Sequence, residues 1–254
     1  MPVEHLDPLA FKAWLRSEAL SSGFGLAGFA SCEPFDAERE RLEAWFQEGR
    51  GSLLPYLNAT TLLDPRALWP AARTALVGFF PYARPEAVPG ATPDSLKLSR
   101  YLWGPDYHML LKPRLTRLLE AAQLRWPGLE GRVCVDTAPL LERQLAARAG
   151  LGWQGKHTLL IAGKDGSWGF LGVLLLSVAV PPDEPFTVEH CGSCTACLDV
   201  CPSGALEPFR LDPARCLTTY TIETEVEPPV DHAAEHRDFV ALERLARTQR
   251  DRGA

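Results

Sequence analysis

The sequence predicts a mixed α/β (α+β) protein in which a large domain precedes a smaller, cysteine-bearing module. Short apolar runs, typical of buried strands, alternate with helical patterns over residues 1–180. The 254 residues are 46% hydrophobic and 23% charged, which fits a globular protein and excludes a disordered one. Five of the seven cysteines lie between Cys191 and Cys216, which indicates a metal-binding module rather than a disulfide scaffold.

The first elements follow from local signals. Asp7 before a proline is typical of a helix start, because its carboxylate caps free N–H groups. Phe24 to Ala30 is apolar and glycine-rich, which predicts a buried strand, and Phe35 to Gln47 has helical spacing. Thr74 to Phe80 is a short apolar run closed by proline, so we expect a second buried strand.

The later elements continue this alternation. Tyr107 to Gln123 predicts an amphipathic helix despite Pro113. Val133 to Val135 predicts a short strand, and Leu140 to Ala149 a helix that a glycine ends. Lys164-Asp165-Gly166, between apolar runs at 158–162 and 168–177, predicts the turn of a β-hairpin.

Composition also predicts boundaries and location. The proline-rich segment 181–185 reads as a linker, so we expect domains over 1–180 and 181–224 and a polar, cysteine-free tail over 225–254. The longest apolar stretch, Phe170 to Val180, is too interrupted for a membrane helix, and the acidic start shows no secretory signal. A net charge of −6 excludes nucleic-acid binding by bulk electrostatics but not a local basic groove. We expect a cytoplasmic protein without a membrane partner.

The cysteine run Cys191-x2-Cys194-x2-Cys197-x3-Cys201-Pro is the bacterial ferredoxin pattern, which wraps three thiolates around one face of a 4Fe–4S cluster. Zinc is the alternative, although zinc sites favour two separated pairs. Three of the cysteines supply one cluster, while Cys201 and Cys216 supply only two ligands for another. The chain therefore offers two partial clusters, or one cluster that Cys216 closes; Cys32 and Cys134 are remote in sequence.

Several blocks in order resemble the epoxyqueuosine reductase family, over about residues 10–224. They are GSLLPYL and LDPRALWPAARTALVGFFPY within 51–82, LSRYLWGPDYHMLL at 98–111, VDTAPLLER at 135–143, GLGWQGKHTLLI at 150–161, GSWGFLG at 166–172, CGSCTACLDVCPSGAL at 191–206, and RCLTTYTIE at 215–223. The resemblance implies a nitroreductase-like cobalamin-binding domain, beside a ferredoxin-like module. It implies that electrons pass through iron–sulfur clusters to cobalt, and that reduced cobalamin removes the epoxide oxygen of epoxyqueuosine in the anticodon loop of tRNA.

Asp136 in VDTAPLLER matches the family's catalytic acid, and a buried carboxyl can stay protonated near neutral pH. The alternative role is a cap for the helix near Leu140. Cys134, two residues earlier, would share the face of Asp136 on a strand, but we expect a buried, inert thiol. The resemblance also implies the residues of the corrinoid pocket. They are Ser99, Tyr107, His108, Lys156, Thr158, Leu160 and Leu171.

Alternatives accompany these assignments. The D-x-H-x-x-G signature of a cobalt-ligating histidine is broken, because Leu111 stands at the glycine position, which fits a family without such a ligand. His108 could equally be a surface or capping residue, and Lys156 could meet a tRNA phosphate. The glycines at 150, 152 and 155 could serve turns only, because a dinucleotide fingerprint would follow a strand.

The tail departs from the family pattern, which continues with further cluster cysteines. We expect a truncated or frame-changed C-terminus, at most one intact cluster, and weak or absent activity on tRNA. Arg244, Arg247 and Arg250 could form a phosphate-binding stripe, but a solvated helix face is the preferred interpretation. The competing functions are a corrinoid reductase of small molecules, as in reductive dehalogenases, and a simple electron-transfer protein. We expect a monomer that receives electrons from a ferredoxin or flavodoxin.

Overall fold

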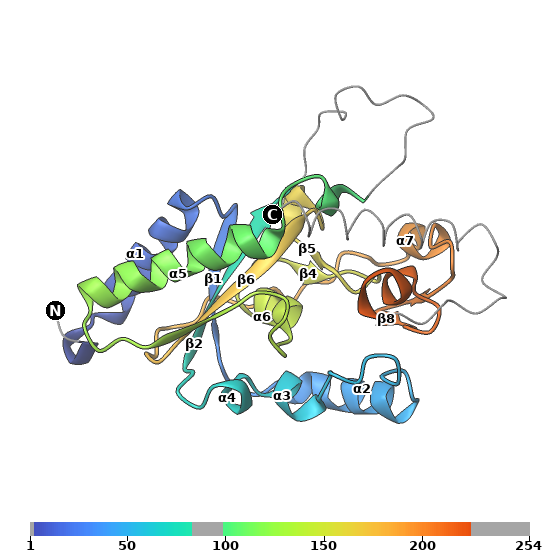
Figure 1. The fold of residues 1–254 in the computed structure, drawn as a ribbon, viewed down its shortest axis with the longest axis horizontal. Helices are drawn as coiled ribbons and strands as arrows, with labels where there is room; N and C mark the ends of the chain where they lie inside the picture. Colours follow the sequence, from blue (N-terminus) through green and yellow to red (C-terminus); the bar gives the residue numbers. More distant parts are fainter. Residues whose placement is uncertain (1–2, 83–98, 225–254) are drawn as a thin grey trace, which may run out of the picture.

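The computed structural model describes residues 3–82 and 99–224, with a four-stranded antiparallel sheet at its centre (Figure 1). The strand order is β1-β2-β6-β3. The strands are β1 (Leu26–Ser31), β2 (Thr74–Pro81), β6 (Gly169–Leu176) and β3 (Gly131–Cys134). The two central strands are apolar along nearly their whole length because both faces of the sheet are covered.

The helices α1 (Pro8–Ser21) and α5 (Tyr107–Arg125) lie side by side on one face (Figure 1). They bury Phe11, Leu15, Leu111 and Leu115 against alternate residues of the strands. Asp7 caps α1 as predicted, since its Oδ1 accepts hydrogen bonds from the N–H groups of the second and third helical residues. The helix α5 runs through Pro113 without a break, as its amphipathic pattern indicated.

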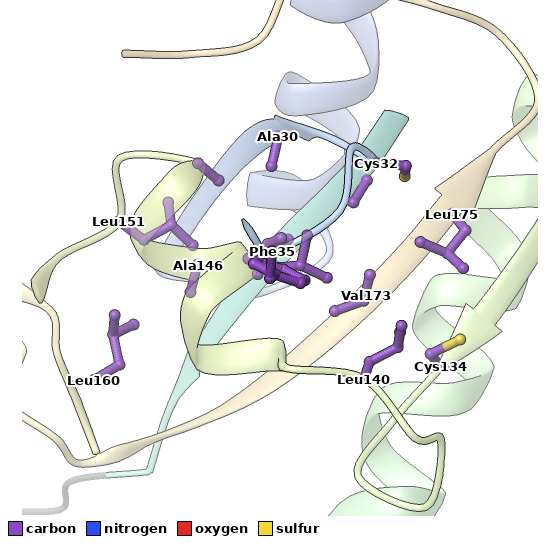
Figure 2. Packing of buried hydrophobic residues seen from close by; sticks show 14 of the residues in the cluster. Ala30, Cys32, Phe35, Cys134, Leu140, Ala146, Leu151, Leu160, Val173 and Leu175 are labelled. Carbon is purple, nitrogen blue, oxygen red and sulfur yellow. The ribbon is translucent and has the colours of Figure 1, made fainter. Parts of the chain in front are cut away.

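The opposite face is covered by α6 (Glu142–Arg148) and by the segment that leads into α2 (Asp36–Gln47) (Figure 1). Figure 2 shows Ala146 and Phe35 gathered over Val173 and Leu175 of β6. The short helices α3 (Ala59–Leu63) and α4 (Pro65–Leu68) follow α2 and lead into β2. This burial on both faces fixes the register of every strand, because a slip of one residue would exchange the two sets of side chains.

The predicted β-hairpin around Lys164-Asp165-Gly166 is wrong. The short strand β5 (Leu160–Ile161) pairs with β4 (Trp153–Gln154), whereas β6 pairs with β2 and β3. The 3-10 turn η3 (Gly163–Asp165) redirects the chain instead, with the Ala162 N–H donating to the Gly166 carbonyl. Both edges of β6 are already occupied, so β5 could not add to it.

The remaining described elements are short. The 3-10 turns η1 (Val3–His5) and η2 (Arg100–Leu102) precede α1 and α5. The cysteine region holds α7 (Ala196–Asp199), β7 (Leu206–Glu207), β8 (Arg210–Leu211) and the π-helical turn η4 (Thr219–Glu223). The predicted tail, with its three arginines, lies outside the described residues. Among the helices of the described chain, none combines the length and apolar character needed to cross a membrane.

The segment 181–190 after β6 has no regular structure, and Asp183 holds it to α1 and β1. Its carboxylate forms an ion pair with Lys12 Nζ at 2.8 Å and accepts a hydrogen bond from the Phe29 N–H at 2.8 Å. It also accepts a hydrogen bond from the guanidinium of Arg16. These partners lower the pKa of Asp183 despite its partial burial, which raises it. The predicted linker is therefore fastened at its start, which orients the chain that enters the cysteine region.

Candidate active site

Asp136 lies on the loop between β3 and α6, just beyond the buried Cys134. Its backbone has a φ of +53°, the left-handed region that residues with a Cβ disfavour. The expected burial of this carboxyl is wrong, because the side chain is 60% exposed. The Asp136 N–H donates to Glu142 Oε1 at 3.0 Å. Asp136 does not cap α6, whose N-cap residue is Leu141 without a capping side chain. The Asp136 backbone is therefore strained, and its exposed carboxyl has no capping role at the start of α6.

His108 and Tyr107 approach this carboxyl from the start of α5. His108 Nδ1 lies 2.8 Å from Asp106 Oδ1 and donates to it, because a carboxylate only accepts. The other ring nitrogen, Nε2, lies 3.6 Å from Oδ2 of Asp136. Nε2 is buried and has no hydrogen-bond partner within the described part of the chain. The imidazole is thus held with one nitrogen available to a proton or a ligand.

Stacked rings fix Tyr107 in place. It stacks on His108 with ring centroids 4.2 Å apart, and on Phe170 of β6 at 4.4 Å and an interplanar angle of 11°. Burial raises the pKa of Tyr107, and the charge and hydrogen bond of Asp136 raise it further. The phenol therefore keeps its proton over the physiological range. Of the predicted site residues, the structure brings Asp136, Tyr107 and His108 together.

Sequence reasoning missed Glu142 and Arg143, the first two residues of α6. Burial raises the pKa of Glu142 to about 8, the Asp136 charge adds to this effect, and the hydrogen bond and Arg143 oppose it. Arg143 Nη1 donates to the carbonyl of Thr158 at 2.9 Å and to its Oγ1 at 3.1 Å. Thr158 also has a positive φ, of +71°. A signal was present, because two charged residues follow directly on an apolar pair in VDTAPLLER.

The other predicted pocket residues are more spread out. Leu160 is buried in β5 and the partly buried Leu171 packs against the same cluster, where Figure 2 shows Leu160 beside α6. Ser99 directly precedes η2. Lys156 donates from Nζ to the carbonyls of Gly192 and Cys194, at 2.6 and 2.9 Å. Lys156 is therefore directed to the cysteine loop, and its predicted contact with a corrinoid stays a prediction.

The predicted cluster ligands are five free thiols around α7. Among the described residues, no three His, Cys, Asp or Glu side chains form a group that could hold a single metal ion. A four-iron cube instead spreads its thiolates over separate iron atoms. Burial raises the pKa of Cys201, but hydrogen bonds from the N–H groups of Leu206, Ala205 and Ser203 and from the Ser203 hydroxyl leave it lowered overall.

Contacts from α2 and the loop that follows it reach the cysteine region. Trp45 Nε1 donates to the carbonyl of Leu211 at 3.0 Å, and the Tyr56 hydroxyl donates to Glu223 at 2.5 Å. Glu48 pairs with Arg210, and Arg50 bonds Glu207 at 3.2 Å. The strands β7 and β8 and the turn η4 thus rest on α2 and the loop that follows it, at the right of Figure 1. Cys32 and Cys134 are buried in the core, where burial raises their pKa to about 12 and 11, so the expected buried thiol at 134 is confirmed.

The residues present fit both implied groups. Soft thiolates with amide donors around Cys201 are the ligand chemistry of an iron–sulfur cluster. The buried, unpaired Nε2 of His108 beside apolar and aromatic side chains suits a group that brings its own hydrogen-bond donors. A carboxyl, a phenol and an imidazole lie together in a chain that also carries a cysteine run of ferredoxin spacing, and this combination is typical of an oxidoreductase.

Comparisons with known proteins make this class specific. The model of the family described as "Epoxyqueuosine reductase QueG, DUF1730" matches residues 63–137. Curated epoxyqueuosine reductases from Leadbetterella byssophila and Xanthomonas campestris are 33% and 37% identical over 89% of this chain. The match covers 74% and 65% of those two proteins. The chain belongs to the epoxyqueuosine reductase family.

Solved structures agree with this assignment and with the mixed α/β fold. The Streptococcus thermophilus epoxyqueuosine reductase matches 87% of this chain with a TM-score of 0.77 and 28% identity. An epoxyqueuosine reductase bound to an epoxyqueuosine-modified tRNA stem loop matches 89%, with a TM-score of 0.74 and 28% identity. A Bacillus subtilis relative, 26% identical, has its aspartate-bearing catalytic loop swung out of the active site. The chain spans 60% of the length of each of these structures.

Proposed function

We propose that the chain reduces epoxyqueuosine to queuosine in the anticodon loop of tRNA. Membership of the epoxyqueuosine reductase family supports the reaction, and the relative bound to a modified tRNA stem loop supports the substrate. The observation that carries the proposal is the position of Asp136. An exposed carboxyl in strained backbone, with Tyr107 and His108 beside it, suits proton delivery to a substrate that enters from solvent.

The chemistry assigns a role to each of these groups. Loss of the epoxide oxygen as water, with formation of a carbon–carbon double bond, consumes two electrons and two protons. Asp136 donates a proton to the oxygen as its carbon–oxygen bond breaks. His108, oriented by Asp106, takes a proton from solvent at Nε2 and passes it to Asp136, 3.6 Å away, so that Asp136 can donate the second proton and water can leave. The Tyr107 hydroxyl, which its raised pKa keeps protonated, orients the carboxyl by hydrogen bonding.

The implied cofactors belong to this proposal. A corrinoid bound beside Ser99, Tyr107, His108, Thr158, Leu160 and Leu171 would deliver the electrons. A 4Fe–4S cluster on Cys191, Cys194 and Cys197, closed by Cys216, would supply them, with Cys201 left as a ligand of a second, partial cluster. A nitroreductase-like domain over 1–180 and a ferredoxin-like module over 181–224 would then be the two working parts. The ammonium of Lys156, bonded to two carbonyls of the cysteine loop, holds that loop against the large domain. A ferredoxin or flavodoxin would donate to a monomer.

Anaerobic turnover tests this function. The chain, reconstituted with iron, sulfide and cobalamin and supplied with a reductant, is incubated with a tRNA stem loop that contains epoxyqueuosine. Mass spectrometry of the digested RNA should show the loss of one oxygen atom. Reduction of halogenated organics without any change in the RNA would contradict the proposal and favour a small-molecule reductase. Cluster reduction with neither reaction would favour an electron-transfer protein.

A further inference from the structure

The loop that carries Asp136 has few hydrogen bonds of its own. Thr137 donates to the carbonyl of Val135, and Leu140 donates to that of Ala138. These bonds join residues only two apart, so they shape local turns and do not tie the loop to the rest of the domain. The Asp136 N–H, in contrast, reaches six residues along the chain to Glu142 Oε1.

Glu142 is a well-anchored acceptor. It is the first residue of α6, and the helix is fixed by Leu145 and Ala146, which are fully buried against the sheet. Four titratable side chains lie near this carboxyl: Cys134 on β3, Tyr107 on α5, Asp136 on the loop and Arg143 on α6. Its raised pKa leaves most of the group neutral at pH 7, so it accepts the Asp136 N–H without placing a full negative charge beside the catalytic carboxyl.

The left-handed backbone conformation of Asp136 is unfavourable and has to be stabilised by its surroundings. A left-handed φ at a residue with a Cβ persists where the surrounding structure over-determines it. Extended backbone at Asp136 would turn its side chain away from His108, because φ sets the direction in which Cβ leaves the chain. The hydrogen bond from Asp136 N–H to a fixed oxygen therefore sets the direction of the side chain.

We propose that Glu142 is a positioning residue for the proposed reaction: its Oε1 holds the Asp136 backbone in the left-handed conformation that places the Asp136 carboxyl beside His108 and the substrate. The inference rests on the proposed function for its catalytic consequence. The hold on the loop can be measured without any substrate. Glutamine at 142 would keep an accepting oxygen in the same place, whereas alanine would remove it.

The test compares Glu142→Ala, Glu142→Gln and a control, Glu40→Ala, at an exposed position of α2. In hydrogen–deuterium exchange of the full chain, Glu142→Ala should speed exchange of the peptide containing Asp136 by about tenfold, as loss of one hydrogen bond implies. Glu142→Gln and Glu40→Ala should stay within about twofold of the wild type. In turnover, Glu142→Ala should lower kcat by about tenfold with KM for the stem loop nearly unchanged, and glutamine should restore kcat.

Several results would overturn the inference. Unchanged exchange and kcat in Glu142→Ala would mean that the loop holds itself. A glutamine variant as impaired as alanine would mean that the accepting oxygen is not what matters. Faster exchange in Glu142→Ala, together with no turnover by the wild-type chain, would support the hold on the loop and count against the proposed function alone.

Discussion

Replacing Glu142 by glutamine should remove a pH dependence from the stability of the fold. The half-buried carboxyl has its pKa raised from the ordinary 4.5 to about 8, mainly by loss of solvation. The folded chain therefore binds a proton at this site between these pH values, where the unfolded chain has lost it. Ionisation is harder in the folded state, so stability from this group is present at low pH and is lost as the pH rises to about 8.

The magnitude follows from the shift. At about 1.4 kcal/mol per pKa unit, a rise from 4.5 to about 8 corresponds to roughly 5 kcal/mol as an upper limit. Water reaches part of this half-buried side chain and screens its neighbours, so we expect about 2 kcal/mol. The neighbouring titratable groups are the same in both chains, so their contributions to the free energy of unfolding largely cancel when the variant is compared with the wild type. They are Asp136, Arg143, Tyr107 and Cys134.

Anaerobic urea unfolding of both chains between pH 5 and pH 9 measures this difference. The stability of the glutamine variant relative to the wild type should rise by about 2 kcal/mol over that range, most steeply below pH 8. Glu40→Ala should show no such trend. Parallel stability curves for wild type and Glu142→Gln would refute the reasoning, because they would mean that Glu142 ionises as easily in the folded as in the unfolded chain.

Four further predictions concern the site and the cysteine region. Asp136→Asn should keep the fold and corrinoid binding, measured by circular dichroism and by cobalamin absorption, but lose most turnover, because an amide does not donate a proton as an acid does; near-normal turnover would make Asp136 structural. Cys194→Ala should abolish the broad visible absorption of the anaerobically reconstituted cluster, whereas stoichiometric zinc without iron uptake would contradict the iron–sulfur assignment. Lys156→Gln should speed cluster loss under chelator by about tenfold relative to Lys156→Arg, since it weakens two charge-assisted bonds to the cysteine loop; equal rates would mean that the loop holds itself. Iron analysis should give about four irons per chain, and about eight with robust RNA turnover would overturn the expectation of one intact cluster.

Several features of this protein could be predicted from sequence because their causes are local. The cap at Asp7 and the helix through Tyr107 follow from short-range hydrogen bonding and apolar spacing. The strands at Thr74 and Trp168 follow from apolar runs that only a sheet covered on both faces can bury. The cysteine spacing and the family blocks likewise depend only on residue order, and they are enough to indicate the family.

Tertiary structure decided what depends on distant partners. The prediction of a hairpin at Lys164 was wrong because strand pairing depends on which edges of a strand are free. Both edges of β6 are occupied, by β2 and β3. The Asp136–Glu142 bond joins an amide to a carboxyl whose position depends on how α6 packs, and no local pattern encodes that distance. The same holds for Lys156, whose ammonium donates to carbonyls of residues 36 and 38 positions further along the chain. Sequence fixes which groups can exchange protons or bind metal, whereas packing decides which of them meet.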